Sequence, residues 1–233
     1  MDRGNFVYNL LENCDSMLDI GCASGYYTKL YAKKCKEIIG IDPNKDLVEK
    51  AKKENPELEF IEAGAENLPF KEETFNTVIL SDVLEHVQDE TKSLEEIYRV
   101  LKKDGILIIT VPHTGLFSFL DVDNYSWRLR QHPKLYNFIH RLKGREAPKV
   151  KEGYTNKHRH YSIKDLRILL NKFEILNYKR RGLITGYIGN HLELFSRWIF
   201  NKTLKFNRIR YLDSNINFGR ISDSISIIAK KSE

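Results

Sequence analysis

The feature that most constrains the fold is a regular alternation of short β-branched runs with helix-like segments over the first 111 residues. The runs lie at residues 17–20, 37–41, 58–62, 77–81 and 106–111. The clearest helical pattern between them spans 91–101, where Leu94, Ile97, Tyr98 and Leu101 recur at helical spacing. Strands that alternate with helices of this length form βαβ units, and these predict an α/β fold with a parallel sheet.

Two local signals refine this expectation. Lys102, Lys103 and Gly105 follow the helical pattern, and basic residues before a glycine are typical of a helix C-terminus. The run ILIITV at 106–111 has no polar alternation, which is typical of a strand that is covered on both faces.

The alternation stops after Pro112, where aromatic residues mix with histidine, lysine and arginine in no clear period. Farther on, Ser162 and Asp165 have the spacing of a capping box that begins a helix. Strand-like stretches then follow this helix and end the chain. The boundaries that we predict are 1–233 for a single domain, 15–111 for its core, and about 113–160 and 183–220 for two lid-like insertions.

Charge is distributed unevenly along the chain. Residues 1–119 carry 14 Lys and Arg against 22 Asp and Glu, whereas residues 120–233 carry 24 against 10, and the net charge is +6. A basic second half favours an anionic partner. An ordinary solvated surface explains the same surplus.

Three further features indicate a cytoplasmic protein. Cys14, Cys22 and Cys35 are odd in number and lack metal-ligand spacing, which argues against a disulfide framework. The sequence also has no apolar stretch long enough to span a bilayer, and its first residues do not resemble a signal peptide.

The stretch LDIGCASGYYTK contains a loop of small residues, 21–25, which lets a ligand approach the backbone closely. A dinucleotide fingerprint would need glycine or alanine at Tyr26, and a P-loop would need lysine after Gly25. Asp19, two residues before the loop, would repel a phosphate but suits a cation. S-adenosylmethionine (SAM) carries a sulfonium and an ammonium group and no phosphate, so the loop favours SAM.

Asp42 ends the next strand, 17 residues after Gly25. A carboxylate at that position accepts both hydroxyls of a ribose in many adenosine-binding sheets. Because NAD sites use the same contact, Asp42 supports SAM only together with Asp19. Asp42 can also be the N-cap of the helix that follows it.

Five stretches within residues 18–112 resemble the core of the class I SAM-dependent methyltransferases, in particular the subgroup that includes ubiquinone and menaquinone methyltransferases. The stretches are LDIGCASG, IIGIDPN, GAENLPF, FNTVILSDVLEHV and RVLKKDGILIITVP. The resemblance implies a Rossmann-like, doubly wound sheet of seven strands with the last strand antiparallel. It also implies SAM as cofactor, bound across the ends of the first four strands, and S-adenosylhomocysteine as product.

The resemblance further implies contacts residue by residue. The methionine half of SAM is expected to contact Asp19, Gly21, Ala23 and Gly25. The ribose is expected to contact Asp42, and the adenine is expected to contact Pro43, Ala65 and Glu66. Ser81 is expected to lie near the methyl-bearing sulfur. Ser81 and Asp82 can instead cap a helix formed by the following residues, DVLEHV.

The chain departs from the family pattern at two positions. Ala23 stands where glycine is usual, which is acceptable at a negative φ. Gly64 stands where an aspartate commonly binds the adenine amino group. Either Glu62 or Glu66 takes over this contact, or the backbone and packing alone hold the adenine.

Four histidines are candidate bases, because methylation of a hydroxyl requires removal of a proton. His86 lies in a motif where the family often has histidine, and His113 directly follows the fifth strand. His158 and His160 lie in the stretch KHRHYS, which resembles a stretch that faces the substrate cleft of related enzymes. Each also has a purely structural interpretation. We predict no metal site, because His158 and His160 have no accompanying Asp–His or Cys pair.

These features together predict a SAM-dependent methyltransferase that acts on an oxygen of a small or lipid-linked acceptor. Aromatic residues mixed with arginine and lysine in the insertions suit contact with an anionic membrane surface, and they equally suit nucleic acid. We favour the lipid because the aromatic residues lie among long aliphatic ones and no RNA-binding module is recognisable. The alternatives are an RNA methyltransferase, a non-catalytic SAM-binding scaffold and, third, an NAD-dependent oxidoreductase.

Overall fold

The computed structural model describes residues 3–115, 132–142, 159–181, 219, 222 and 224–232. Within these ranges the elements are α1 (Arg3–Leu10), β1 (Cys14–Ile20), α2 (Tyr26–Tyr31), a short 3-10 helix (Ala32–Lys34), β2 (Cys35–Asp42), α3 (Lys45–Glu54), β3 (Glu59–Glu62), β4 (Phe75–Ser81), α4 (Glu90–Val100), β5 (Leu101–Pro112), α6 (Pro133–Leu142), α7 (Ile163–Leu169), β6 (Phe173–Arg181) and β7 (Ser224–Lys231). Most of the two predicted insertions, 113–160 and 183–220, lies outside the described residues.

The strands form one seven-stranded sheet in the order β3-β2-β1-β4-β5-β7-β6. Strands β1 to β5 are parallel, and β7 runs antiparallel to both β5 and β6. This topology confirms the predicted Rossmann-like sheet with its last strand antiparallel. The strand order reverses between β1 and β4, so a crevice for a ligand is expected at their carboxyl ends.

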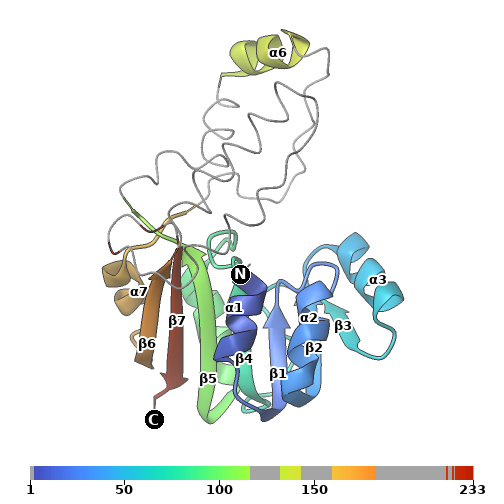
Figure 1. Ribbon diagram of the computed structural model, residues 1–233, viewed down its shortest axis with the longest axis vertical. Coiled ribbons are helices and arrows are strands. Elements are labelled where there is room, and N and C mark those ends of the chain that lie inside the picture. The colour runs from blue at the N-terminus through green and yellow to red at the C-terminus, as the bar shows by residue number, and fades with distance from the viewer. Residues whose placement is uncertain are drawn as a thin grey trace.

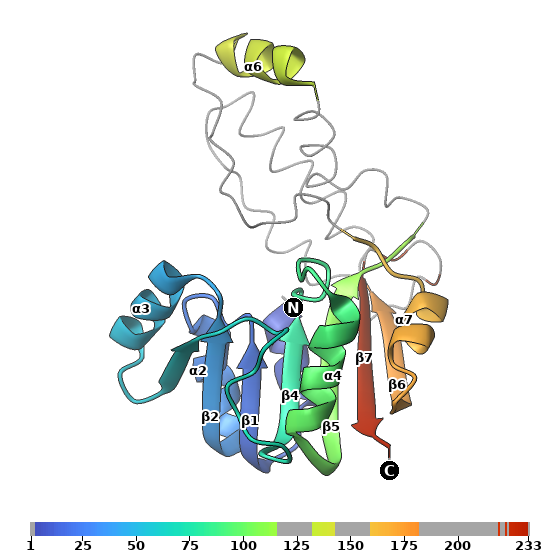
Figure 2. The ribbon, with the colours of Figure 1, turned by 180° about the vertical axis from the view of Figure 1, so that it is seen from behind.

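Helices cover both faces of the sheet. Figure 1 shows α1 and α2 in front of it, and Figure 2 shows α4 and α7 on the other face. Residues that alternate along β1, β4 and β5 fill the two layers: Met17, Ile79 and Ile108 on the side of α1 and α2, and Leu18, Leu80 and Leu107 on the other. Because both faces are covered, the middle of each strand has consecutive apolar residues, at 17–18, 78–80 and 106–109.

The predicted helix stop at Gly105 is wrong. Helix α4 ends at Val100, and Leu101 is already extended and pairs with Phe75 of β4. Gly105 lies inside β5, where a Cβ would come within 2.8 Å of the Lys102 carbonyl oxygen. The glycine therefore permits a close backbone approach rather than ending the helix.

The segment after β4 is also not helical, so the interpretation of Ser81 and Asp82 as helix caps is wrong. Residues 82–89 form turns, and Asp82 adopts a left-handed φ of 56°. The cap of α4 is Asp89, whose carboxylate accepts a hydrogen bond of 3.0 Å from the backbone nitrogen of Lys92. This irregular segment can therefore face the crevice.

The capping box of Ser162 and Asp165 is present and begins α7, as the sequence predicts. Helix α6 lies apart from the sheet, beyond the carboxyl ends of the parallel strands (Figure 1). None of the helices in the described part of the chain is long and apolar enough to cross a membrane.

Candidate functional site

A cleft of about 660 Å³ opens at the carboxyl ends of β1, β2 and β4, where the strand order reverses. Four loop segments line it, after β1, β2, β3 and β4 respectively. Its lining includes six of the predicted cofactor residues, Gly21, Ala23, Asp42, Pro43, Ala65 and Glu66, together with His86.

The loop after β1 turns sharply through three left-handed residues. Gly21 and Gly25 have φ of 75° and 77°, and Ala23 has φ of 48°. The expectation of a negative φ at Ala23 is therefore wrong. The turn directs the Ala23 N–H toward Asp42, and the strain of this conformation costs about 1–2 kcal/mol for a residue with a Cβ.

Gly25 lies outside the cleft lining and begins α2. A Cβ at this position would come within 2.7 Å of the Phe60 ring and 2.9 Å of the Asn55 side chain. Its glycine is therefore required by packing behind the loop, and the predicted contact with the methionine half stays a prediction.

Asp42 connects the two loops on either side of the cleft. Its Oδ2 accepts a hydrogen bond of 3.0 Å from the Ala23 nitrogen, and its Oδ1 accepts one of 2.8 Å from the Asn44 nitrogen. The N-cap of α3 is Asn44, so the alternative that Asp42 is the cap is wrong. Each carboxylate oxygen can still accept a second hydrogen bond from a ligand in the cleft.

Asp19 lies beneath the loop, outside the cleft lining, and is only 4% exposed. Its Oδ2 accepts a hydrogen bond of 2.6 Å from the Thr28 hydroxyl. Burial and the nearby charge of Asp42 raise the pKa of Asp19 to about 7. A buried acid of this kind is ionised most readily beside a cation, and the expected contact of Asp19 with the cationic half of SAM stays a prediction.

Glu66 lies next to the position where the family pattern has aspartate. Its Oε2 lies 3.2 Å from where a Cβ of residue 64 would be, and its Oε1 accepts a hydrogen bond of 2.8 Å from the Gln88 nitrogen. Glu62 also lines the cleft but its side chain is exposed. Of the two acids that the sequence leaves open, Glu66 is therefore the better placed.

We expect Glu66→Gln to weaken the binding of S-adenosylhomocysteine about tenfold. The substitution replaces the expected charge-assisted hydrogen bond between the adenine amino group and the carboxylate with a neutral one. Glu62→Gln, the matched control, should change the affinity less than about twofold. Isothermal titration calorimetry measures both. Adding Gly64→Asp to Glu66→Gln should restore the affinity, whereas equal losses in the two single variants would contradict the assignment.

Ser81 does not line the cleft, and its neighbour Asp82 does. The Ser81 hydroxyl is 2.9 Å from that of Thr110, which donates a hydrogen bond of 3.2 Å to Asp82. The sequence interpretation missed Asp82 as a lining residue. Its signal was its place directly after a buried strand.

His113 is buried at the end of β5, with Nδ1 3.1 Å from the Ser222 carbonyl oxygen. Because a carbonyl only accepts, Nδ1 carries the proton, and Nε2 is left as the acceptor of a neutral imidazole. Burial lowers the pKa of His113, and the charges of Arg180 and His160 lower it further. These are the properties of a base at neutral pH.

The other candidate histidines are distributed around the same edge of the sheet. His86 is exposed on the cleft lining, and His160 acts electrostatically on His113. His158 lies outside the described residues. Among the residues that the structure describes, no three His, Cys, Asp or Glu side chains gather in a metal-binding cluster.

A polar network joins the segment after β4 to the residues around His160. Arg159 lies 3.1 Å from Glu90 in an ion pair, and its Nη2 donates to the Gln88 carbonyl at 3.5 Å. The single hydroxyl proton of Tyr161 is shared between Glu90 and the Leu84 carbonyl oxygen, which is 3.1 Å away. Sequence reasoning missed this network, because it considered only the histidines of KHRHYS.

The network connects directly to β5. The Tyr161 nitrogen donates to the Pro112 carbonyl at 2.9 Å, and the Thr114 nitrogen donates to the Tyr161 carbonyl at 3.1 Å. These bonds flank His113. The cofactor cleft, the 82–90 segment and His113 therefore form one connected site.

Comparison with known proteins agrees with this geometry. A family model described as "Methyltransferase domain" matches residues 18–109. The ubiquinone/menaquinone biosynthesis C-methyltransferase UbiE of Campylobacter jejuni is 32% identical over 173 residues, which cover 69% of this chain and 71% of that protein. The chain belongs to the class I SAM-dependent methyltransferases.

A further relative and a solved structure are also similar to this methyltransferase. A probable S-adenosylmethionine-dependent methyltransferase of Mycobacterium tuberculosis, Rv3030, is 29% identical over 119 residues, covering 50% of this chain and 43% of that one. The crystal structure of the YcgJ protein of Bacillus subtilis superposes with a TM-score of 0.62 at 20% identity, over 99% of this chain and 98% of that one. The latter likeness shows the fold.

Proposed function

We propose that this methyltransferase transfers the methyl group of SAM to an oxygen of a small or lipid-linked acceptor. The observation that carries the proposal is the contact of the His113 Nδ1 with the Ser222 carbonyl oxygen, which leaves Nε2 as an acceptor at the same edge of the sheet as the cofactor cleft. Bound SAM supplies a methyl group that the sulfonium activates toward attack. The protein aligns the attacking atom and removes its proton.

The described residues divide this work. Asp19 and Asp42 hold the cationic and ribose parts of the cofactor, and His113 takes the proton of the acceptor hydroxyl. The Arg159–Glu90 ion pair holds the segment beside His113 against the lining of the cleft. Arg159 and Glu90 are thus positioning residues.

A second candidate is methylation of a ring carbon. The observation that favours it is the name of the relative UbiE, a C-methyltransferase of ubiquinone and menaquinone biosynthesis. Methylation of a quinol carbon also ends with loss of a proton from the ring, so it uses the same base.

Contact with an anionic membrane surface is part of the proposal. In α6, Lys134 and Arg141 are exposed, and Phe138 is 56% exposed beside them. An apolar ring between cationic side chains is typical of helices that lie in a membrane interface.

The test is a transfer assay with methyl-labelled SAM and a lysate of the source cells. Lipid, small-molecule, RNA and protein fractions are counted against an Asp19→Asn control. We expect label in the lipid or small-molecule fraction, and NMR of the product then distinguishes an O-methyl from a C-methyl group. Label confined to RNA or protein would overturn the acceptor class, and counts equal to the control in every fraction would favour a non-catalytic SAM-binding scaffold.

A further inference from the structure

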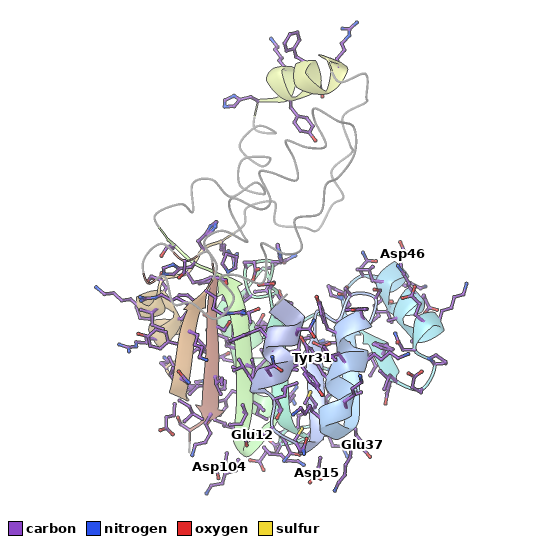
Figure 3. The ribbon with its side chains drawn as sticks, in the orientation of Figure 1. Glu12, Asp15, Tyr31, Glu37, Asp46 and Asp104 are labelled. Atoms are coloured by element: carbon purple, nitrogen blue, oxygen red, sulfur yellow. The ribbon has the colours of Figure 1, made fainter. Side chains whose placement is uncertain are left out.

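A second hollow, of about 690 Å³, lies at the opposite end of the sheet from the cofactor cleft. Glu12, Asp15 and Asp104 belong to its lining, and Figure 3 shows them together at the end of the molecule away from α6. Cys14 and Cys35 line the same hollow, and both side chains are half-buried. The methyltransferase activity uses neither thiol.

The two cysteines face each other across neighbouring strands. Cys14 is the first residue of β1, Cys35 is the first residue of β2, and the two are direct partners in the parallel register. Neighbouring strands lie about 4.8 Å apart. Disulfides join Cα atoms that are about 4.4–6.8 Å apart, so the backbone already has the required spacing. The Cys14 thiol is 3.8 Å from the Ser16 carbonyl oxygen and the Cys35 thiol is 3.9 Å from the Tyr31 carbonyl oxygen, so neither thiol is held by a short hydrogen bond.

We propose that Cys14 and Cys35 are an oxidisable dithiol site that closes to an intramolecular disulfide. The oxidant is a low-molecular-weight disulfide such as oxidised glutathione. The Cys14 thiolate attacks one sulfur of the oxidant and releases one glutathione thiolate, and the Cys35 thiolate then attacks the Cys14 sulfur and releases the second. The two protein thiols lose two protons and two electrons in total, and the two glutathione thiolates carry the electrons and take up protons.

The surroundings of the pair make this exchange slow at neutral pH. Burial raises the pKa of both thiols, that of Cys35 to about 12. The charge of Asp15 raises the pKa of Cys14 further, whereas Lys102 and a hydrogen bond with Thr77 lower it. Cys14 is therefore the first attacking thiol, and the rate rises about tenfold per pH unit below its pKa.

The bridge would enclose a functional part of the chain. The residues between Cys14 and Cys35 comprise the rest of β1, the 21–25 loop, α2 and the short 3-10 helix. A covalent ring around this unit restricts its unfolded state and stabilises the folded protein. Because the bridge lies at the other end of the strands, the cofactor cleft keeps its shape.

The test treats the full chain with oxidised glutathione at pH 8.5 and maps the thiols by mass spectrometry. We expect a Cys14–Cys35 linked peptide that lacks two hydrogen atoms, a raised melting temperature that dithiothreitol reverses, and an affinity for S-adenosylhomocysteine within about twofold of the reduced protein. Cys22→Ser, a control in the cofactor loop, should form the same bridge.

Cys14→Ser should abolish both the linked peptide and the rise in melting temperature. The proposal is overturned by a stable mixed disulfide with glutathione in the unmodified sequence, by bridges between two chains only, or by the absence of any reaction under conditions that oxidise the denatured chain. The affinity for S-adenosylhomocysteine distinguishes a failure of the disulfide proposal from a failure of the methyl-transfer function, because methyl transfer does not depend on Cys14 and Cys35.

Discussion

Asp19→Asn should abolish measurable SAM binding and at the same time stabilise the unliganded protein. In the folded state the pKa of Asp19 is raised from 3.8 to about 7 by burial and by Asp42. A difference of this size disfavours the ionised form in the folded protein by about 4 kcal/mol above pH 7. The amide is neutral, so the variant avoids this cost, but it cannot offer a negative charge to the sulfonium or ammonium group.

The sign of the pH dependence follows from the raised pKa. Protonated Asp19 is favoured by folding, so its contribution to stability is complete below pH 3.8, declines as the pH rises, and is lost above about pH 7. Urea unfolding of the unliganded protein between pH 5 and 8 should show this decline, and Asp19→Asn should remove it. SAM binding should have the opposite dependence and weaken about tenfold per pH unit below 7.

Asp15→Asn is the matched control, because Asp15 is an exposed acid on the same strand. It should leave the binding of S-adenosylhomocysteine unchanged. If Asp19→Asn binds the cofactor as tightly as the unmodified sequence, or is no more stable than it at pH 8, then Asp19 is not held as a strained acid for a cationic ligand.

The sequence predicted the sheet well because its evidence is local and repeated. Uninterrupted apolar runs such as ILIITV require cover on both faces, and the resemblance supplied the antiparallel last strand that β7 forms. The failures concern spacing between elements. Gly105 looks like a helix stop, but it lies inside β5, where a Cβ would come within 3.3 Å of the Asn76 carbonyl oxygen of β4, which is a tertiary distance.

In the site, too, local features could be predicted from the sequence and tertiary contacts could not. Asp19, Gly21 and Asp42 could be predicted because each lies at the end of a buried strand. The conformation of Ala23 depends on its hydrogen bond to Asp42, 19 residues away, and the placing of Glu66 depends on Gln88 in another loop. Contacts of that kind leave no periodic pattern in the sequence.

Replacing His113 should have the largest effect on turnover. We expect His113→Gln to lower kcat by about 10²–10⁴-fold, the usual contribution of a general base. The affinity for S-adenosylhomocysteine should stay within about twofold, because His113 is not part of the cofactor cleft lining. Single-turnover kinetics and calorimetry on the same preparation separate the two quantities.

The pH profile distinguishes a base from a structural histidine. Burial, Arg180 and His160 lower the pKa of His113 below its ordinary 6.5, and the base acts when it is deprotonated. At saturating SAM, kcat should therefore be level above pH 6.5 and fall only on the acid side of the lowered pKa, and this limb should disappear in His113→Gln. His160→Gln and His86→Gln are the matched controls, and they should keep both kcat within about tenfold and the acid limb. If His160→Gln loses the limb while His113→Gln keeps it, the proton is taken by His160, and the buried His113 only supports the carbonyl of Ser222.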